Sequence, residues 1–384
     1  MKKISLMSIA CIASIHAEDK VTVTPKALVE ASLGLADSSS KTVLPVSLGN
    51  VRYGLDISKG QGSAEFEAYV NPYVNSKKAS LLLSKAIVGL KSTDSTVGVA
   101  LGRFKPLSPV TYGAEPSKYS LAYSPEFGSA DGLVVSYGQK INELNLGLEV
   151  YVANSLGGSD PLSGYDPTFT PSADSLYDTP LSISARVYGL GVALETMGVV
   201  AQFAFATHNG YFSPIAPGVI SDATRFIGSL GYAGLAGLNG GVYYKSATLS
   251  SSVPYTVDKN DIKKLDANTS TKSLDATASV IGVGVRADST LANIKGIINA
   301  EDKFSLGLSY ALGAMTHKVS NSLDKEYNQT EIALDVTYTY YPGTEIILGY
   351  GTWSLAKAKA YKQNDGVTAT NSKNSVYLGT RFVL

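Results

Sequence analysis

The stretch Ser375-Val376-Tyr377-Leu378-Gly379-Thr380-Arg381-Phe382-Val383-Leu384 alternates between two faces up to its last residue. One face carries Val376, Leu378, Phe382 and Leu384, and the other carries Ser375, Gly379 and Arg381. A period of two residues predicts a β-strand. A strand with one apolar and one polar face suits a sheet that closes on itself in lipid.

The same alternation recurs along the chain. The apolar side chains of one segment are Val51, Tyr53, Leu55 and Ile57, opposite Asn50, Arg52, Asp56 and Ser58. After a turn at 59–62, the next segment sets Ala64, Phe66, Ala68 and Val70 opposite Glu65, Glu67, Tyr69 and Asn71. Unpaired charge is costly to bury, so a charged face repeated on several strands argues against the core of a β-sandwich.

Sixteen segments read as strands of a length that suits a tilted membrane-spanning strand. The predicted strands are 26–36, 46–58, 63–74, 79–91, 96–104, 132–140, 143–153, 181–194, 198–207, 222–232, 237–248, 276–287, 304–316, 330–340, 345–358 and 374–384. Short turns alternate with long polar loops, although the loop at 75–78 is short and the turn at 288–303 is long. We therefore predict an all-β fold, a transmembrane antiparallel barrel of about sixteen strands.

Composition agrees with this fold class and excludes others. The chain has 37 Gly, 24 Tyr and a single cysteine, Cys11, and its mean hydropathy is +0.07. One cysteine excludes an intramolecular disulfide. Beyond the amino-terminal segment, no stretch approaches eighteen uncharged apolar residues, which excludes a helical membrane protein. The 32 basic and 32 acidic residues leave no basic excess for nucleic acid.

The amino-terminal segment reads as a secretory signal peptide. Lys2 and Lys3 precede an apolar run from Ile4 to Ile15, and His16-Ala17 precedes the polar Glu18-Asp19-Lys20. Residues 1–17 are thus predicted to be removed, leaving 18–384 as the barrel with a net charge of −2 after loss of the two lysines. A lipoprotein signal through Ser8-Ile9-Ala10-Cys11 is the alternative.

Residues 105–131 carry the most specific motif. Pro125-Glu126-Phe127-Gly128, followed by Ser129-Ala130-Asp131, resembles the third loop of Gram-negative general diffusion porins, and Gly102-Arg103-Phe104 resembles the residues before that loop. The terminal strand also resembles the carboxy-terminal signal of bacterial outer-membrane proteins, with Leu384 in place of Phe. The resemblance implies that 105–131 folds into the lumen. A competing register, similar to neisserial porins, makes Tyr123-Ser124-Pro125-Glu126-Phe127 a strand and tight turn and places 154–180 on the periplasmic side.

The resemblance and the alternation together nominate residues that line a pore. Carboxylates on an inward loop facing basic side chains on the wall set a transverse field across a wet constriction. The acidic candidates on the loop are Glu115, Glu126 and Asp131. The basic candidates on the wall are Lys26, Arg52, Arg186, Arg286, Arg381 and Lys85, for which alternation allows either face.

These features imply a channel in the bacterial outer membrane for passive diffusion of ions and small hydrophilic solutes. The resemblance implies a homotrimer in contact with outer-membrane lipids, and no cofactor. The alternatives are a substrate-specific channel and a surface adhesin on a plugged barrel. We expect no enzymatic activity, since His208 and His317 have no neighbouring Ser or carboxylate that the sequence identifies as a catalytic dyad.

Overall fold

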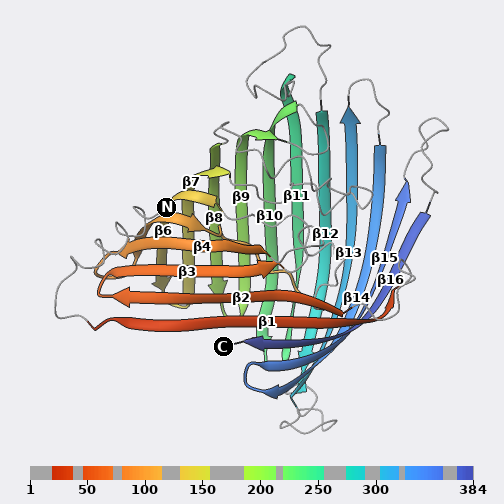
Figure 1. Cartoon of the computed structure of the whole chain (residues 1–384), viewed down its shortest axis with the longest axis horizontal. Coiled ribbons are helices and arrows are strands. Elements are labelled where there is room, and N and C mark those ends of the chain that lie inside the picture. Colours follow the sequence, from red (N-terminus) through yellow and green to blue (C-terminus); the bar gives the residue numbers. More distant parts are fainter. Residues whose placement is uncertain are drawn as a thin grey trace.

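The chain forms a closed β-barrel in a computed structural model (Figure 1). The structure describes residues 20–37, 46–71, 80–114, 130–155, 186–212, 219–254, 274–289, 303–319, 325–357 and 370–383. Its strands are β1 (Thr22–Asp37), β2 (Val46–Lys59), β3 (Gly62–Asn71), β4 (Ser80–Lys91), β5 (Val97–Phe104), β6 (Ala130–Ile141), β7 (Leu144–Ser155), β8 (Arg186–Thr196), β9 (Val199–Phe212), β10 (Val219–Leu235), β11 (Leu238–Pro254), β12 (Leu274–Asp288), β13 (Phe304–Val319), β14 (Lys325–Tyr341), β15 (Thr344–Lys357) and β16 (Thr370–Val383).

Each strand pairs with its neighbours in the chain, and β1 closes the ring by pairing antiparallel with β16. Leu28 lies opposite Val383 and Glu30 opposite Arg381 at this seam, where the end of β16 runs beside β1 (Figure 1). The predicted fold class and the number of strands are thus confirmed. The boundaries differ by a few residues, most at β11, which continues to Pro254 instead of ending at 248.

The short turns gather at one end of the barrel because consecutive strands run antiparallel. Five of them, at 60–61, 142–143, 197–198, 236–237 and 342–343, have two residues. Met197 and Gly198 have φ values of 47° and 81°, the left-handed pair that a tight hairpin with the twist of its strands requires.

In the turn between β4 and β5, hydrogen bonds from Ser92 and Thr96 lower the pKa of Asp94.

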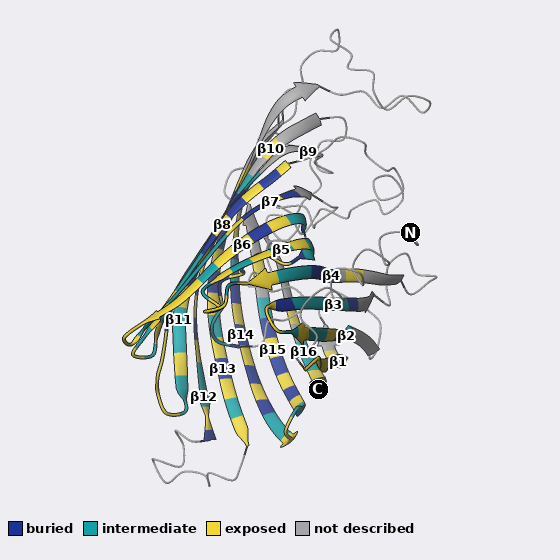
Figure 2. Ribbon diagram, turned by 90° about the vertical axis from the view of Figure 1, so that its left-hand side faces the viewer, coloured by how far each residue is buried: buried dark blue, intermediate teal, exposed yellow. Residues whose placement is uncertain are grey.

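Side chains on the outer face of the barrel are apolar and exposed. On β14, Ile332, Leu334 and Val336 are each about two-fifths exposed, whereas the intervening Ala333 and Asp335 are buried. Figure 2 shows this alternation of buried and exposed residues on successive strands. Near the short turns, Tyr340 and Tyr341 are more than half exposed. An apolar belt with aromatic residues at its border is the outer surface of a barrel that spans lipid.

One irregularity determines which way Lys85 points. Glu67 lies opposite Lys85, but Ala68 lies opposite Leu83, so Ser84 is an extra residue in a β-bulge. Leu83 is exposed on the outside, while Lys85 forms an ion pair with Glu65 on the inner face of β3. The bulge explains why simple alternation assigns Lys85 to either face.

The pairing of β5 with β6 bears on the position of the Pro125–Phe127 motif. Phe104 lies opposite Ala130 and Val97 opposite Tyr137, so these two strands are direct neighbours in the sheet with no strand between them. β5 and β7 consequently end at the same end of the barrel, which agrees with the third-loop resemblance and not with a further strand between β5 and β6. The motif itself lies outside the described residues.

Within the described residues, the structure contains no helix that is long and apolar enough to cross a membrane.

Candidate functional site

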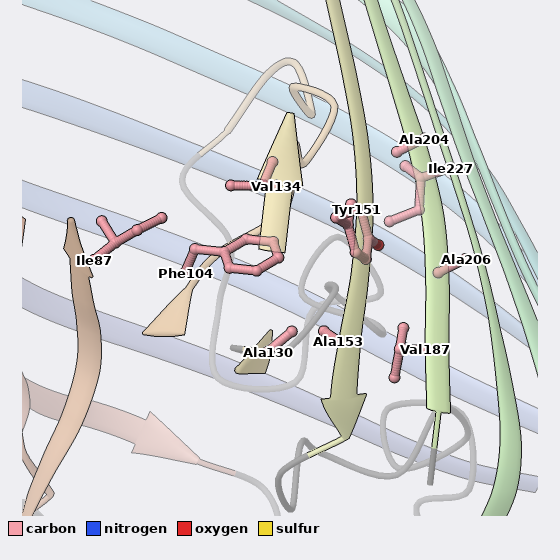
Figure 3. Packing of buried hydrophobic residues seen from close by; sticks show 10 residues of the cluster. All are labelled: Ile87, Phe104, Ala130, Val134, Tyr151, Ala153, Val187, Ala204, Ala206 and Ile227. Atoms are coloured by element: carbon pink, nitrogen blue, oxygen red, sulfur yellow. The ribbon is translucent and has the colours of Figure 1, made fainter. Parts of the chain in front are cut away.

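Part of the inner wall is apolar. Phe104, Tyr151 and Ile227 belong to a buried cluster that lines the inside from β4 to β10 (Figure 3). The Phe104 and Tyr151 rings meet edge to face with centroids 5.4 Å apart, a favourable arrangement for aromatic quadrupoles. The inner face is therefore divided into an apolar sector and a charged sector, which period-two alternation does not predict.

The chain that follows β5 lies against this wall. Residues 105–114, called the inner segment below, make hydrogen bonds with side chains that project inward from distant strands. The Leu107 amide donates to Glu149 Oε1 on β7 at 3.1 Å, and the Val110 amide donates to Gln202 Oε1 on β9 at 2.8 Å. Pro106 and Pro109 come directly before these two contacts, and both are buried; proline has no amide hydrogen to satisfy and favours an extended chain.

An ion pair holds the far end of the inner segment. Arg286 on β12 donates to both carboxylate oxygens of Asp335 on β14, with Nη2 2.7 Å from Oδ2 and 3.0 Å from Oδ1. Its Nε donates to the Gly113 carbonyl oxygen at 3.2 Å. The Asp335 side chain is fully buried. One guanidinium thus joins two strands of the wall to the inner segment.

Further ion pairs line the inside of β1 to β4. Lys26 pairs with Asp56, and Lys85 pairs with Glu65. Lys105, in the inner segment, has its Nζ 3.2 Å from Glu67 Oε1 on β3. Acidic and basic side chains are interspersed on this sector, so their fields largely cancel at a distance.

A third group of charges bridges the seam of the barrel. Arg381 on β16 donates from Nε to Glu30 Oε1 on β1 at 2.9 Å and from Nη1 to Glu345 Oε2 on β15 at 3.2 Å. These three residues lie directly opposite one another across adjacent strands. The strand that closes the barrel is therefore tied to both neighbours by one guanidinium.

Three further charges of the wall, which were not among the predicted site residues, are also deeply buried. Arg225 on β10 and Lys245 on β11 are each 2% exposed, and Glu331 on β14 is 3% exposed. Lys245 Nζ lies 5.5 Å from the centre of the Tyr243 ring, within the range of a cation–π contact. The signal that locates Arg225 is the alternation of β10, where Arg225, Ile227 and Ser229 face inward; this signal is weak because Ile227 shares the inner face.

Among the predicted basic residues, five lie on the inner face. They are Lys26, Arg52, Lys85, Arg286 and Arg381. Of the predicted acidic residues, Glu115 and Glu126 lie outside the described residues.

Arg186 and Asp131 differ from the prediction, because both face outward. Arg186 shares its face of β8 with the exposed Tyr188 and Leu190, while Val187 is buried inside. The predicted alternation placed Val187 on the lipid-facing side because it is apolar. The inner wall of β8 is also apolar, so an apolar side chain does not identify the outer face of this strand.

Asp131 shares its face of β6 with the exposed Leu133, whereas Val134 is buried inside. Its carboxylate accepts two hydrogen bonds from Arg103 on β5, with Nε 2.8 Å from Oδ1 and Nη2 3.2 Å from Oδ2. The pair lies near the ends of both strands, where β5 leads into the inner segment. Asp131 therefore belongs to an outward ion pair at the barrel rim and not to the lumen.

The described residues hold no group of three or more His, Cys, Asp or Glu side chains placed to bind a metal ion. The chemistry available on the inner face is that of fixed charges, hydrogen-bonding groups and an apolar surface.

A closed antiparallel barrel of sixteen strands, with an apolar outer belt and a charged sector inside, has the fold of outer-membrane porin-like barrels. Solved structures of this class share its fold. They include OmpT of Vibrio cholerae, with a TM-score of 0.56 and 13% sequence identity over 97% of this chain and 100% of that one. They also include an anion-selective porin from Comamonas acidovorans, with a TM-score of 0.56 and 14% sequence identity over 95% of this chain and 100% of that one. The outer-membrane channel DcaP of Acinetobacter baumannii has a TM-score of 0.51 and 11% sequence identity over 96% of this chain and 99% of that one.

One of the OmpT structures is of a trimer form. No protein-family model matches the chain, and no curated protein sequence matches it. At these identities the likeness establishes the fold.

Proposed function

We propose that the protein is an outer-membrane channel for passive diffusion of ions and small hydrophilic solutes, narrowed by residues 105–131. The observation that carries the proposal is the inner segment, which crosses from Glu149 on β7 to the Arg286–Asp335 pair on β12 and β14. A chain held across the inner wall reduces the open cross-section of the lumen. Charged side chains around it favour polar solutes over apolar ones.

The proposal includes transport in place of catalysis, no bound cofactor, and a homotrimer in the bacterial outer membrane. The apolar outer belt supports the membrane location, since such a surface is stable only against lipid or another apolar face. The trimer form of one structural neighbour supports the oligomeric state.

A plugged barrel that serves as an adhesin is the second candidate. It is favoured by the burial of Arg225, Lys245 and Glu331, each at most 3% exposed on the inner face. Charges that water does not reach indicate that the lumen is filled along β10 to β14. The two functions differ in whether a continuous water path remains.

Recordings of purified protein in planar lipid bilayers test the proposal. Discrete open steps in potassium chloride support the channel, and steps blocked selectively by one class of solute indicate a substrate-specific channel. Heat-modifiable migration on gels verifies that the protein used is folded. Folded protein that inserts but produces no steps would overturn the proposal in favour of the plugged barrel.

A further inference from the structure

Three glycines lie side by side on the inner face of adjacent strands. Gly231 on β10 is opposite Gly241 on β11, and Gly241 is opposite Gly284 on β12. We call Gly231, Gly241 and Gly284 the glycine row. Because none of the three has a side chain, the row leaves a shallow strip in a wall that elsewhere carries inward side chains.

Tyr112 of the inner segment occupies this strip. A Cβ atom added at Gly231 would lie 1.9 Å from Tyr112 Cζ, and one added at Gly284 would lie 2.0 Å from the Tyr112 carbonyl oxygen. At Gly241 the added atom would lie 2.7 Å from Tyr112 Cδ2. Real Cβ atoms do not come so close, so Gly231 and Gly284 must be glycine for the tyrosine to lie where it does. At Gly241 an added Cβ would also meet the Leu230 carbonyl oxygen of β10, at 2.4 Å.

The next residue continues the contact. Gly113 has a φ of +105°, a value that favours glycine. A Cβ there would lie 2.8 Å from Gly284 Cα and 2.9 Å from Ser309 Cβ on β13. Glycines on both sides of the contact allow two backbones to approach closely.

The inner segment contacts the wall on both sides of Tyr112. Its contacts run from Leu107, beside Gly191 on β8, to Ala114, beside Gly307 on β13. Tyr112 lies between these two ends, so its position fixes the middle of a segment that is held at both sides.

We propose that the glycine row is the seat of Tyr112, and that this contact sets the width of the lumen by fixing the line along which the inner segment crosses the wall. The inference rests on the proposed channel function and names Tyr112 as the residue that positions the narrowing. The whole end of the Tyr112 side chain performs this role: Cζ, the hydroxyl oxygen and Cε1 lie 1.9, 2.0 and 2.3 Å from a Cβ atom added at Gly231.

Two substitutions on opposite sides of the contact test the proposal. Tyr112→Ala removes the ring. Gly231→Ala adds a methyl group whose three nearest neighbours are all atoms of the Tyr112 side chain, so the flexible tyrosine moves before the wall does. Each change is expected to raise single-channel conductance, whereas Tyr112→Phe, which keeps the ring, raises it less than Tyr112→Ala. Gly379→Ala is the matched control, because an added Cβ at this inward glycine has no neighbour closer than 3.7 Å.

The double variant Tyr112→Ala/Gly231→Ala is the decisive member. Residues in contact give non-additive effects, and residues that are not in contact give additive ones. The methyl group at 231 should add nothing once the ring is gone, so the conductance of the double variant equals that of Tyr112→Ala. Additive increases in conductance, or single variants that conduct like the parent protein, would overturn the proposed contact between Tyr112 and the glycine row.

A second readout separates this inference from the channel function. The urea midpoint for unfolding, followed by gel migration, should fall in each single variant and show the same non-additivity in the double variant. If the parent protein gives no open steps but the midpoints are coupled, the channel function fails and the seat of Tyr112 stands. If the parent conducts and the midpoints are additive, the seat fails and the channel stands.

Discussion

Arg286 and Asp335 meet across the intervening strand β13, directly above Gly307. A Cβ at Gly307 would lie 2.7 Å from Asp335 Oδ2 and 2.8 Å from Arg286 Nη2, and 2.7 Å from Ala114 Cα. The wall therefore has a glycine where the ion pair and the end of the inner segment pass over it. Removal of either charge, or addition of a side chain beneath them, should disturb the same point.

We expect Asp335→Asn to lower the free energy of unfolding by about 3 kcal/mol, because it replaces the fully buried carboxylate that pairs with a largely buried guanidinium by a neutral amide. Urea unfolding in lipid vesicles measures this loss. Glu345→Gln is the control: its carboxylate is 29% exposed, whereas that of Asp335 is fully buried, and Arg381 keeps its ion pair with Glu30, so the loss should be smaller. Equal losses of unfolding free energy in the two variants would show that the burial of Asp335 does not contribute to stability.

Gly307→Ala should destabilise the barrel by about 1–3 kcal/mol, as overpacking does in close-packed interiors. It should also raise conductance, since the added methyl group displaces Ala114 and with it the inner segment. Gly147→Ala serves as the comparison, because the nearest atom to an added Cβ there is 3.6 Å away. Conductance that stays at the parent value despite a loss of stability would separate the two effects and contradict the link to the segment.

A comparison of Arg52 and Arg186 tests which of them faces the lumen and which faces outward. Arg52 shares the inner face of β2 with Asp56, whereas Arg186 lies on the outer face of β8. Arg52→Ala should shift the reversal potential in a salt gradient toward cation preference, because a fixed positive charge leaves the lumen. Arg186→Ala should leave the reversal potential unchanged; a shift of equal size would contradict its outward position.

Arg381→Ala should increase preference for cations and weaken the seam of the barrel. It removes the positive charge shared by Glu30 and Glu345, leaving two inward carboxylates. Reversal potentials report the first effect and urea midpoints the second. Arg381→Lys keeps the charge but not the planar fork that reaches two partners, so it should retain the selectivity of the parent and lose stability. Loss of selectivity in the lysine variant would argue against a role for charge.

A disulfide can locate the start of the inner segment directly. A Cβ at Gly191 would lie 2.8 Å from Leu107 Cβ, and disulfides join Cβ atoms about 3.5–4.5 Å apart, so a small shift permits the bond. In a Cys11→Ser background, Leu107→Cys/Gly191→Cys should form a cross-link on oxidation that changes gel migration until it is reduced. Leu107→Cys/Gly379→Cys places the second thiol on β16 and should not; cross-linking of both pairs, or of neither, would contradict the position of the segment.

Much of the fold could be predicted because each strand is a local pattern. Outward residues such as Ile332 and Leu334 contact lipid while inward residues such as Asp335 do not, and this difference repeats every second residue. The prediction fails where the inner wall is also apolar. Val187 is buried inside, so on β8 hydrophobicity does not distinguish the faces, and Arg186 was assigned to the wrong one. Asp131 was placed on the inward loop by the motif, whereas it lies in β6 on the outer face.

The candidate site could be predicted less completely than the fold. Arg286 and Arg381 were found because they alternate with exposed apolar neighbours such as Val285 and Phe382. Their partners were not found, since Asp335 and Glu30 are 49 and 351 residues away in the chain. Lys85 required the bulge at Ser84, which follows from pairing with β3 and not from its own strand.

The sequence by itself determined that the chain forms sixteen strands in an antiparallel barrel, because alternation and turn residues act between near neighbours. Only the tertiary structure decided how the lumen is narrowed. The seat of Tyr112 needs Gly231, Gly241 and Gly284 in register on three strands. The ion pair that holds the end of the inner segment needs Arg286 and Asp335 on either side of Gly307. Such contacts depend on strand register and barrel closure, which bring together residues far apart in the chain.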